Sequence, residues 1–298
     1  MVFSRLRQVF AAAPPLRPST PERTRVYAVG DVHGRADLLD EVAGLIERDR
    51  VSAPAETITV LLGDYVDRGP QSAAVVERLA SARFPTRLCA LRGNHEAMLL
   101  RFLAEPRFLE VWRGNGGLET LYSYGVDVSS AMRGEGYEET RNAFREALPA
   151  AHRAFLEATE LSATVGNYFF CHAGVRPGAP LSNQSEDDLL WIRDRFLSYE
   201  RSFGKIVVHG HTPVARSEVR GNRINIDTGA FATSILTCLA LEGEDRRIFS
   251  VGGPANRTCE PTRWGAEHTL AAAQFVAVTE SSAALAGPNL RHRAKSCA

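Results

Sequence analysis

The sequence predicts a mixed α/β fold in which two packed, mixed β-sheets are flanked by helices. Short β-branched or apolar runs recur along the chain, and each ends abruptly in Gly, Asp, Asn or His. Helical patterns separate the early runs, whereas the later runs follow one another with little helix between them. Alternation followed by consecutive strands is typical of a mixed sheet, or of two packed sheets, with helices outside.

Five of the predicted strands are followed by polar residues. The runs that end in polar residues are 26–29, 57–62, 87–91, 168–171 and 205–208. Each is long enough for a buried strand. The carboxyl ends of such strands collect ligands, so we expect the polar residues that follow them to meet at one edge. A meander of further strands is predicted at 224–226, 235–241 and 247–251.

Helices are predicted at 38–50, 72–83 and 96–103. Residues 104–163 read as a helical insertion, with glycines at 114, 116 and 117 marking a turn inside it. The main domain is expected to span residues 25–255. Residues 1–24 are basic and rich in proline, which predicts a flexible tail. Residues 256–298 form a C-terminal extension whose polar end is expected to be disordered.

Composition narrows the classes of function. Among 298 residues, 35 Lys and Arg balance 35 Asp and Glu, so the net charge is zero and nucleic-acid binding is disfavoured. No apolar run approaches 18 residues, so stable membrane insertion is not expected. The five cysteines are widely spread and include no CxxC pair, which predicts reduced thiols in a cytoplasmic protein. A secretory signal is disfavoured, because the apolar stretch 9–13 is short and ends at two prolines.

Three glycine-flanked polar segments follow the first three strands: GDVHG at 30–34, GDYVDRG at 63–69 and GNHE at 93–96. His172 and His211 follow later strands. Carboxylates, a carboxamide and imidazoles, without thiolate, suit Mn²⁺, Fe or Zn²⁺ better than Ca²⁺. If one carboxylate bridges, two metals roughly 3.5 to 4 Å apart become feasible, an arrangement suited to phosphoryl transfer.

These segments, with HAG at 172–174 and GHT at 210–212, resemble the phosphoprotein phosphatase family of metallophosphoesterases. The segments after 172 resemble the bacterial and phage members of that family. The resemblance covers roughly residues 25 to 240. It implies the calcineurin-like metallophosphoesterase fold, a catalytic domain at 25–255, and two divalent metal ions per chain. Manganese is favoured over iron or zinc.

The resemblance also implies a role for each site residue. The metal ligands would be Asp31 and His33 for the first metal, Asp64 as the bridge, and Asn94, His172 and His211 for the second.

Around these ligands, His95 would be the acid that protonates the leaving oxygen, with Asp67 holding its ring. Arg68 and Arg193 would bind the substrate phosphate together with Asn94, because a guanidinium matches two phosphate oxygens.

Two of these residue assignments have a rival in the sequence, and one other class of enzyme is disfavoured. Arg195 competes with Arg193 for the phosphate role, and His209 competes with His211 as a ligand. The segment from Asp227 to Gly229 is Asp-Thr-Gly, also an aspartic protease signature. Such a protease needs two copies, and one is present.

The resemblance implies a protein serine/threonine phosphatase that hydrolyses a phosphoprotein or phosphopeptide by direct attack of a metal-bound hydroxide. The alternative is a symmetrical diadenosine tetraphosphate hydrolase, a group that resembles GDLVARG where this chain has Asp67. A catalytically dead binding module is disfavoured, because every expected ligand is present. The physiological substrate, the native metal, the oligomeric state and the role of the tails are left open.

Overall fold

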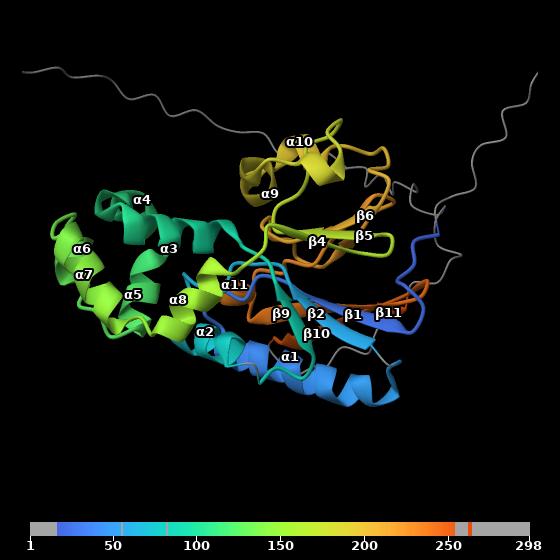
Figure 1. The fold of residues 1–298 in the computed structure, drawn as a ribbon, viewed down its shortest axis with the longest axis horizontal. Coiled ribbons are helices and arrows are strands. Elements are labelled where there is room, and N and C mark those ends of the chain that lie inside the picture. Colours follow the sequence, from blue (N-terminus) through green and yellow to red (C-terminus); the bar gives the residue numbers. More distant parts are fainter. Residues whose placement is uncertain (1–16, 55, 82, 254–261, 264–298) are drawn as a thin grey trace, which may run out of the picture.

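The computed structural model describes residues 17–54, 56–81, 83–253 and 262–263. Two β-sheets pack face to face and helices cover both outer faces (Figure 1). The predicted fold class is therefore confirmed. Most of the predicted N-terminal tail and of the extension 256–298 lies outside the described residues.

The first sheet has six strands in the order β11-β10-β9-β1-β2-β3. Their bounds are Thr24–Val29 for β1, Glu56–Leu61 for β2, Arg87–Ala90 for β3, Ile235–Glu242 for β9, Asp245–Gly252 for β10 and Thr262–Arg263 for β11. Strands β1, β2 and β3 are parallel, whereas β9 runs antiparallel to β1. The sheet is thus mixed, and β1 lies between a strand from early in the chain and one from late in it.

The second sheet has five strands in the order β4-β5-β6-β8-β7. Their bounds are Ser162–Val165 for β4, Tyr168–Cys171 for β5, Ile206–His209 for β6, Glu218–Val219 for β7 and Arg223–Asn225 for β8. The three inner strands are parallel, and the two edge strands are antiparallel to their neighbours. Both sheets therefore present the carboxyl ends of parallel strands.

Alternating side chains along each strand build separate layers of core. Val26 and Ala28 of β1 pack in the cluster between the sheets, with Phe170 of β5 and Val208 of β6. Tyr27 of β1 belongs instead to the cluster under the helices of the first sheet. This alternation fixes which face each strand turns to its partner sheet, and so fixes how the two sets of strand ends meet.

The helices divide by layer. Helix α1 (Ala36–Asp49) packs on the first sheet with α2 (Ser72–Ala80) beside it, and α3 (Asn94–Ala104) packs against the helices of the insertion, whereas α9 (Glu186–Trp191) and α10 (Asp194–Leu197) cover the second sheet. The insertion holds α4 (Leu109–Trp112), α5 (Gly117–Ser123), α6 (Ser129–Met132), α7 (Tyr137–Ala147) and α8 (Ala150–Glu157), and α11 (Ala230–Thr233) precedes β9. Short 3₁₀ turns lie at Arg50–Ser52, Pro106–Phe108, Arg113–Asn115 and Leu181–Asn183. Trp112 and Phe144 of the insertion share one core cluster with α1 and α2, so the insertion is not an independent unit.

Three sequence-based expectations differ from the structure. The predicted meander is wrong, because β8 pairs with β6 in the second sheet while β9 and β10 pair in the first. Strand β4 begins within the stretch assigned to the insertion. Part of the predicted tail is packed, since the backbone N–H of Thr20 donates to Gly243 O and Asn167 N–H donates to Ser19 O.

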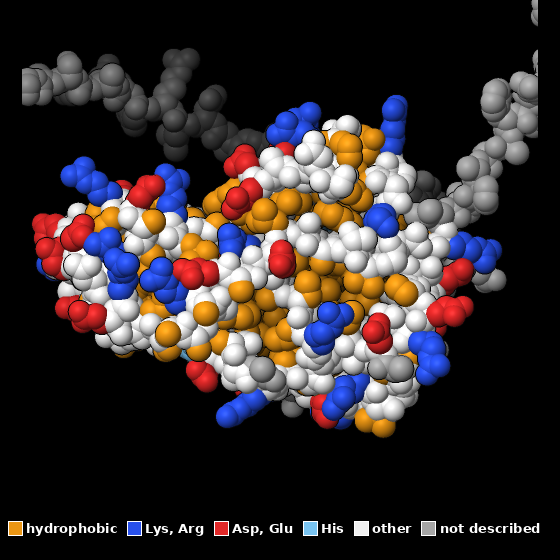
Figure 2. All heavy atoms as spheres, in the orientation of Figure 1, with side chains coloured by type: hydrophobic (Ala, Val, Ile, Leu, Met, Phe, Trp, Pro, Cys, Tyr) orange, Lys and Arg blue, Asp and Glu red, His pale blue; other side chains and the backbone are white. Residues whose placement is uncertain are grey.

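The distribution of surface charge, the cysteines and the helices can be compared with what the composition predicts. On the face that Figure 2 shows, acidic and basic side chains are interspersed over the insertion and over the sheets. Cys89, Cys171 and Cys238 are free thiols, while Cys259 and Cys297 lie outside the described residues. Among the described helices, none has the length and apolar character needed to cross a bilayer.

Candidate metal centre

The polar segments predicted to meet do meet, at the carboxyl ends of strands from both sheets. Asp31 follows β1, Asp64 follows β2, Asn94 follows β3, His172 follows β5 and His211 follows β6. Each is almost fully buried. Because all these strands are parallel within their sheets, their ends share one edge, and the residues after them converge.

Two glycines make this convergence sterically feasible. A Cβ on Gly210 would lie 2.1 Å from Asp31 Oδ1, and one on Gly93 would lie 2.1 Å from Asp64 Oδ1. Neither position accepts a larger residue without displacing a carboxylate. The loops also carry non-glycine residues at positive φ, including Asp64 at 53° and His211 at 65°. Such backbone is costly and clusters at functional sites.

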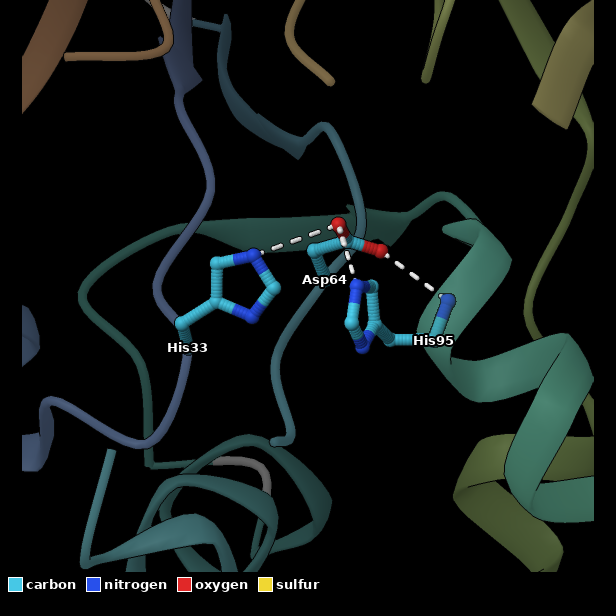
Figure 3. Close-up of side chains that lie close together, drawn as sticks. All are labelled: His33, Asp64 and His95. Carbon is cyan, nitrogen blue, oxygen red and sulfur yellow. Dashed lines mark hydrogen bonds and ion pairs between the residues drawn. The ribbon is translucent and has the colours of Figure 1, made fainter. Parts of the chain in front are cut away.

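The first cluster consists of His33, Asp64 and His95. The rings of His33 and His95 point toward the Asp64 carboxylate (Figure 3). His33 Nε2 lies 3.4 Å and His95 Nε2 lies 3.8 Å from Asp64 Oδ2. His33 Nδ1 donates to Val66 O over 2.9 Å, which leaves Nε2 with its lone pair facing the cluster.

Asp31 borders this first cluster. Its Oδ2 accepts from the backbone N–H of His211 over 3.0 Å, whereas its buried Oδ1 has no hydrogen-bond partner in the part of the chain that the structure describes. A buried carboxylate oxygen without a donor is costly unless a cation or another donor reaches it.

The second cluster consists of Asp64, His172 and His211, joined by Asn94. Asn94 Oδ1 lies 2.8 Å from His172 Nε2 and 2.9 Å from His211 Nδ1. His172 Nδ1 is 2.9 Å from Leu62 O, so its Nε2 lone pair points inward. Acceptor atoms thus crowd one point, and the carboxylate of Asp64 is common to both clusters.

The electrostatics of these side chains fit a cation. Burial lowers the pKa of His33 to about 3 and lowers the pKa values of His172 and His211 as well. The imidazoles are therefore neutral near pH 7, the form that binds metal. Burial raises the pKa of Asp31, and the charges of Asp227 and Asp64 raise it further. Oxygen and imidazole ligands suit a transition-metal dication, and two of them, Asp31 Oδ1 and His211 Nε2, are buried without a hydrogen-bond partner among the described residues.

His95 differs from the other histidines because Asp67 holds it. His95 Nδ1 lies 2.7 Å from Asp67 Oδ2. Burial would lower the pKa of His95, but the carboxylates of Asp64 and Asp67 outweigh it and raise that pKa. His95 also belongs to the first cluster, so it lies close enough to bind a metal ion there, although its Nδ1 is hydrogen-bonded to Asp67.

Arg68 bridges the two imidazoles of the first cluster. Its Nη1 donates to His33 Nε2 over 3.0 Å, and its Nη2 lies 3.0 Å from His95 Nε2. The guanidinium also lies over the ring of Phe231, 4.9 Å from its centroid. A phosphate at this place would meet a fixed cation.

The charges of Arg193 and Arg195 affect different groups. Arg193 is exposed and lies between α9 and α10, so its backbone belongs to neither helix. The charge of Arg193 contributes to the lowered pKa values of His172 and His211. The charge of Arg195 acts instead on Asp188, whose pKa is lowered mainly by Arg176 and Ser185 against the effect of burial.

The structure does not bring His209 into either cluster. Its ring packs edge-on against Phe196 under α10, with ring centroids 4.9 Å apart, and burial lowers its pKa to about 3. Because neighbouring strand residues point to opposite faces, His209 turns into the outer core of the second sheet. Asp227, by contrast, is buried, and its charge raises the pKa of Asp31.

Five residues at the site have no assigned role in the sequence analysis. Glu96 accepts from the backbone N–H groups of Gly93, Asp64, Tyr65 and Val66, so it ties two ligand-bearing loops together. Its place in GNHE was a usable signal. The other four are Trp112, Thr120, Trp191 and Phe231. Their contacts are made across long sequence separations. Trp191 belongs to a Trp-x-Arg segment with Arg193, which was a usable signal, whereas no local pattern marks the other three.

Comparison with known proteins identifies one family and several relatives with different named activities. The profile of the calcineurin-like phosphoesterase family matches residues 24–232. The chain is 26% identical over 232 residues to the asymmetrical bis(5'-nucleosyl)-tetraphosphatase PrpE of Anoxybacillus flavithermus, covering 71% of this chain and 88% of that protein. It is 28% identical over 222 residues to serine/threonine-protein phosphatase 1 of Salmonella typhimurium, covering 73% and 92%.

A crystal structure of a proposed diadenosine tetraphosphatase superposes with a TM-score of 0.55 at 22% identity, covering 79% of this chain and 96% of that chain. At this identity the likeness establishes the fold.

Proposed function

Because the chain belongs to the calcineurin-like phosphoesterase family, we propose that it is a metal-dependent phosphomonoesterase acting on phosphoserine and phosphothreonine in proteins. The observation that carries this proposal is the carboxylate of Asp64, shared by two buried groups of ligand atoms. That arrangement is what a pair of bridged dications requires.

In the proposal Asp31 and His33 hold one dication, with Asp64 as the bridge. Asn94, His172 and His211 hold the other. Two such ions, when bound, neutralise phosphate charge and lower the pKa of water to near neutrality. Manganese is the proposed metal.

The remaining side chains bind the substrate and move one proton. Arg68, Arg193 and Asn94 bind the phosphate oxygens, and the two guanidinium groups offset the charge that builds on them. His95 donates a proton from Nε2 to the leaving oxygen as its bond to phosphorus breaks. Asp67 orients His95 through the 2.7 Å contact to Nδ1.

Two features support a phosphoprotein as the substrate. This chain has Asp67 in GDYVDRG, whereas the symmetrical tetraphosphate hydrolases resemble GDLVARG, with Ala at the matching position. It also spans most of a bacterial relative that is named a serine/threonine-protein phosphatase. A cytoplasmic location is proposed with this substrate, since the described cysteines are free thiols.

A second candidate is hydrolysis of a dinucleoside tetraphosphate. The observation that favours it is the relative from Anoxybacillus flavithermus, which is named an asymmetrical tetraphosphatase. The comparison at Asp67 concerned the symmetrical hydrolases, so it does not separate this chain from the asymmetrical ones.

One experiment tests both candidates. The metal content of the purified protein is measured, and kcat/KM is compared for a phosphoserine peptide and for diadenosine tetraphosphate. We expect two metal ions per chain and higher kcat/KM for the peptide. Asp67→Ala serves as the matched variant and should reduce turnover of the peptide. Faster turnover of the tetraphosphate, undiminished in Asp67→Ala, would replace the first candidate by the second.

A further inference from the structure

The insertion reaches the catalytic centre through the carboxylate of Asp67. Trp112 Nε1 donates to Asp67 Oδ2 over 2.7 Å, and the same oxygen lies 2.7 Å from His95 Nδ1. Thr120 Oγ1 donates to Asp67 Oδ1 over 2.6 Å. All four side chains are almost completely buried. Both carboxylate oxygens are therefore fixed from α4 and α5 of the insertion.

The backbone around Asp67 is tied to the same helices. The N–H of Asp67 lies 2.8 Å from Thr120 Oγ1 and 3.0 Å from Ser72 Oγ. The N–H of Arg68 donates to Gly116 O over 3.2 Å. Asp67 and Arg68 have φ of 73° and 68°, a region that non-glycine residues occupy only when their surroundings hold them there.

Glycines in the insertion let it approach this closely. A Cβ on Gly117 would lie 2.4 Å from Trp112 Cδ2, and one on Gly116 would lie 2.6 Å from Arg68 N. The indole of Trp112 and the loop at Arg68 thus occupy space that larger residues would fill. The contact is close-packed, so the orientation of Asp67 depends on how the insertion docks.

We propose that Trp112 and Thr120 are positioning residues for proton transfer by His95. They fix both oxygens of Asp67, and Asp67 fixes the imidazole so that Nε2 points at the leaving oxygen. The inference rests on the proposed function, in which His95 supplies that proton. It assigns the insertion a part in the chemistry.

The test uses substrates that differ in their need for a proton. A phosphoserine peptide has a poor leaving group, whereas 4-nitrophenyl phosphate has a good one. Thr120→Val removes the hydroxyl with little change of shape, and Trp112→Phe removes the indole N–H while keeping an aromatic ring. We expect each variant to lower kcat for the peptide by about 10- to 100-fold. KM, metal content and kcat for 4-nitrophenyl phosphate should change much less.

Two controls separate positioning from a general loss of structure. Thr140→Val is the matched substitution, because Thr140 is buried in the same insertion but donates only to Gly136 O in its own helix. It should leave the ratio of the two substrates unchanged. Thr120→Ser restores a hydroxyl and should restore turnover of the peptide.

A double-variant cycle shows whether the effect passes through His95. In a His95→Asn background, Thr120→Val should cause no further loss, because residues that act as one unit are not additive. Equal losses for both substrates in Thr120→Val and Trp112→Phe would overturn the inference. If His95→Asn itself shows no dependence on the leaving group, the acid role in the proposed function fails too, and the two failures are thereby distinguished.

Discussion

Arg193 and Arg195 are two residues apart, yet they act on different parts of the molecule. Arg193 influences His172 and His211 at the second cluster, whereas Arg195 influences Asp188. The break between α9 and α10 causes this separation, because it gives Arg193 a non-helical backbone. A residue that acts on the ligands from the protein surface is well placed to meet substrate.

We therefore expect Arg193→Ala to weaken binding of inorganic phosphate and to lower kcat/KM without loss of metal. Arg193→Lys should restore little, since an ammonium does not reproduce the planar fork. Arg195→Ala is the control and should behave like wild type. Phosphate inhibition and metal analysis check this prediction. A silent Arg193→Ala beside a damaging Arg195→Ala would show that Arg195 is the phosphate ligand.

Asp227 gives a residue-scale prediction about stability and pH. Burial raises its pKa to about 6, against the backbone N–H of Gly229, which lowers it. A carboxyl whose pKa is raised by folding costs stability above its unfolded pKa, and the cost grows until the pH passes about 6. Asn in its place keeps the acceptor for Gly229 without the charge.

Asp227→Asn should thus raise the free energy of unfolding of the metal-free protein by about 1 to 3 kcal/mol at pH 8, with the gain vanishing toward pH 4. Urea unfolding of chelated protein across this pH range measures it. A variant that is less stable at pH 8 would show that the charge of Asp227 is compensated within the metal-free fold.

At the scale of elements, the ends of the strands carry the site, and the sequence predicts them well. Runs that stop at Gly-Asp or Gly-Asn are visible locally, because a buried strand needs apolar residues and a tight turn needs glycine. The turn after β6 shows why glycine is needed at such a position. Gly210 lies against the carboxylate of Asp31, which comes from the other sheet.

Gly210→Ala should therefore displace Asp31 and lower both metal content and thermal stability. Gly221→Ala is the matched control, since nothing lies within 4 Å of a Cβ at Gly221, in the turn between β7 and β8. Calorimetric metal titration and thermal melting of the two variants test this expectation. Metal binding by Gly210→Ala equal to that of Gly221→Ala would contradict it.

Other elements were not predictable from local pattern. The sequence pattern predicts β8 and β9 in one meander, because both are short apolar runs, yet these strands pair in different sheets. Which sheet receives a strand is decided by packing between residues far apart in the chain. Local pattern does not predict the contacts of the insertion either, since Trp112 and Thr120 contact Asp67 only after their helices dock.

At the scale of the whole molecule, the candidate ligands come from both sheets. Asp31, Asp64 and Asn94 follow strands of the first sheet, and His172 and His211 follow strands of the second. A cation held between them would link the two sheets. Ligand binding to the folded state alone stabilises it by mass action, about 2.7 kcal/mol when the free metal is 100 times its Kd.

Chelation should accordingly lower the melting temperature, and addition of Mn²⁺ should restore it. Asp64→Asn should melt at the same temperature with and without added metal, because a neutral amide does not bridge two dications. Thermal melts at fixed metal concentrations measure both. A melting temperature indifferent to metal in the wild type would argue against a cation between the sheets.

The place of β9 beside β1 has a consequence for biosynthesis. Val29, near the start of the domain, pairs with Cys238, so one edge of β1 lacks its partner until the ribosome has made all of the matched region, residues 24–232. An unpaired strand edge invites pairing with other chains, and contacts between distant segments form slowly. A nascent chain therefore carries an open, apolar edge through most of its synthesis, and chaperones that shield such edges would act before the last strands emerge.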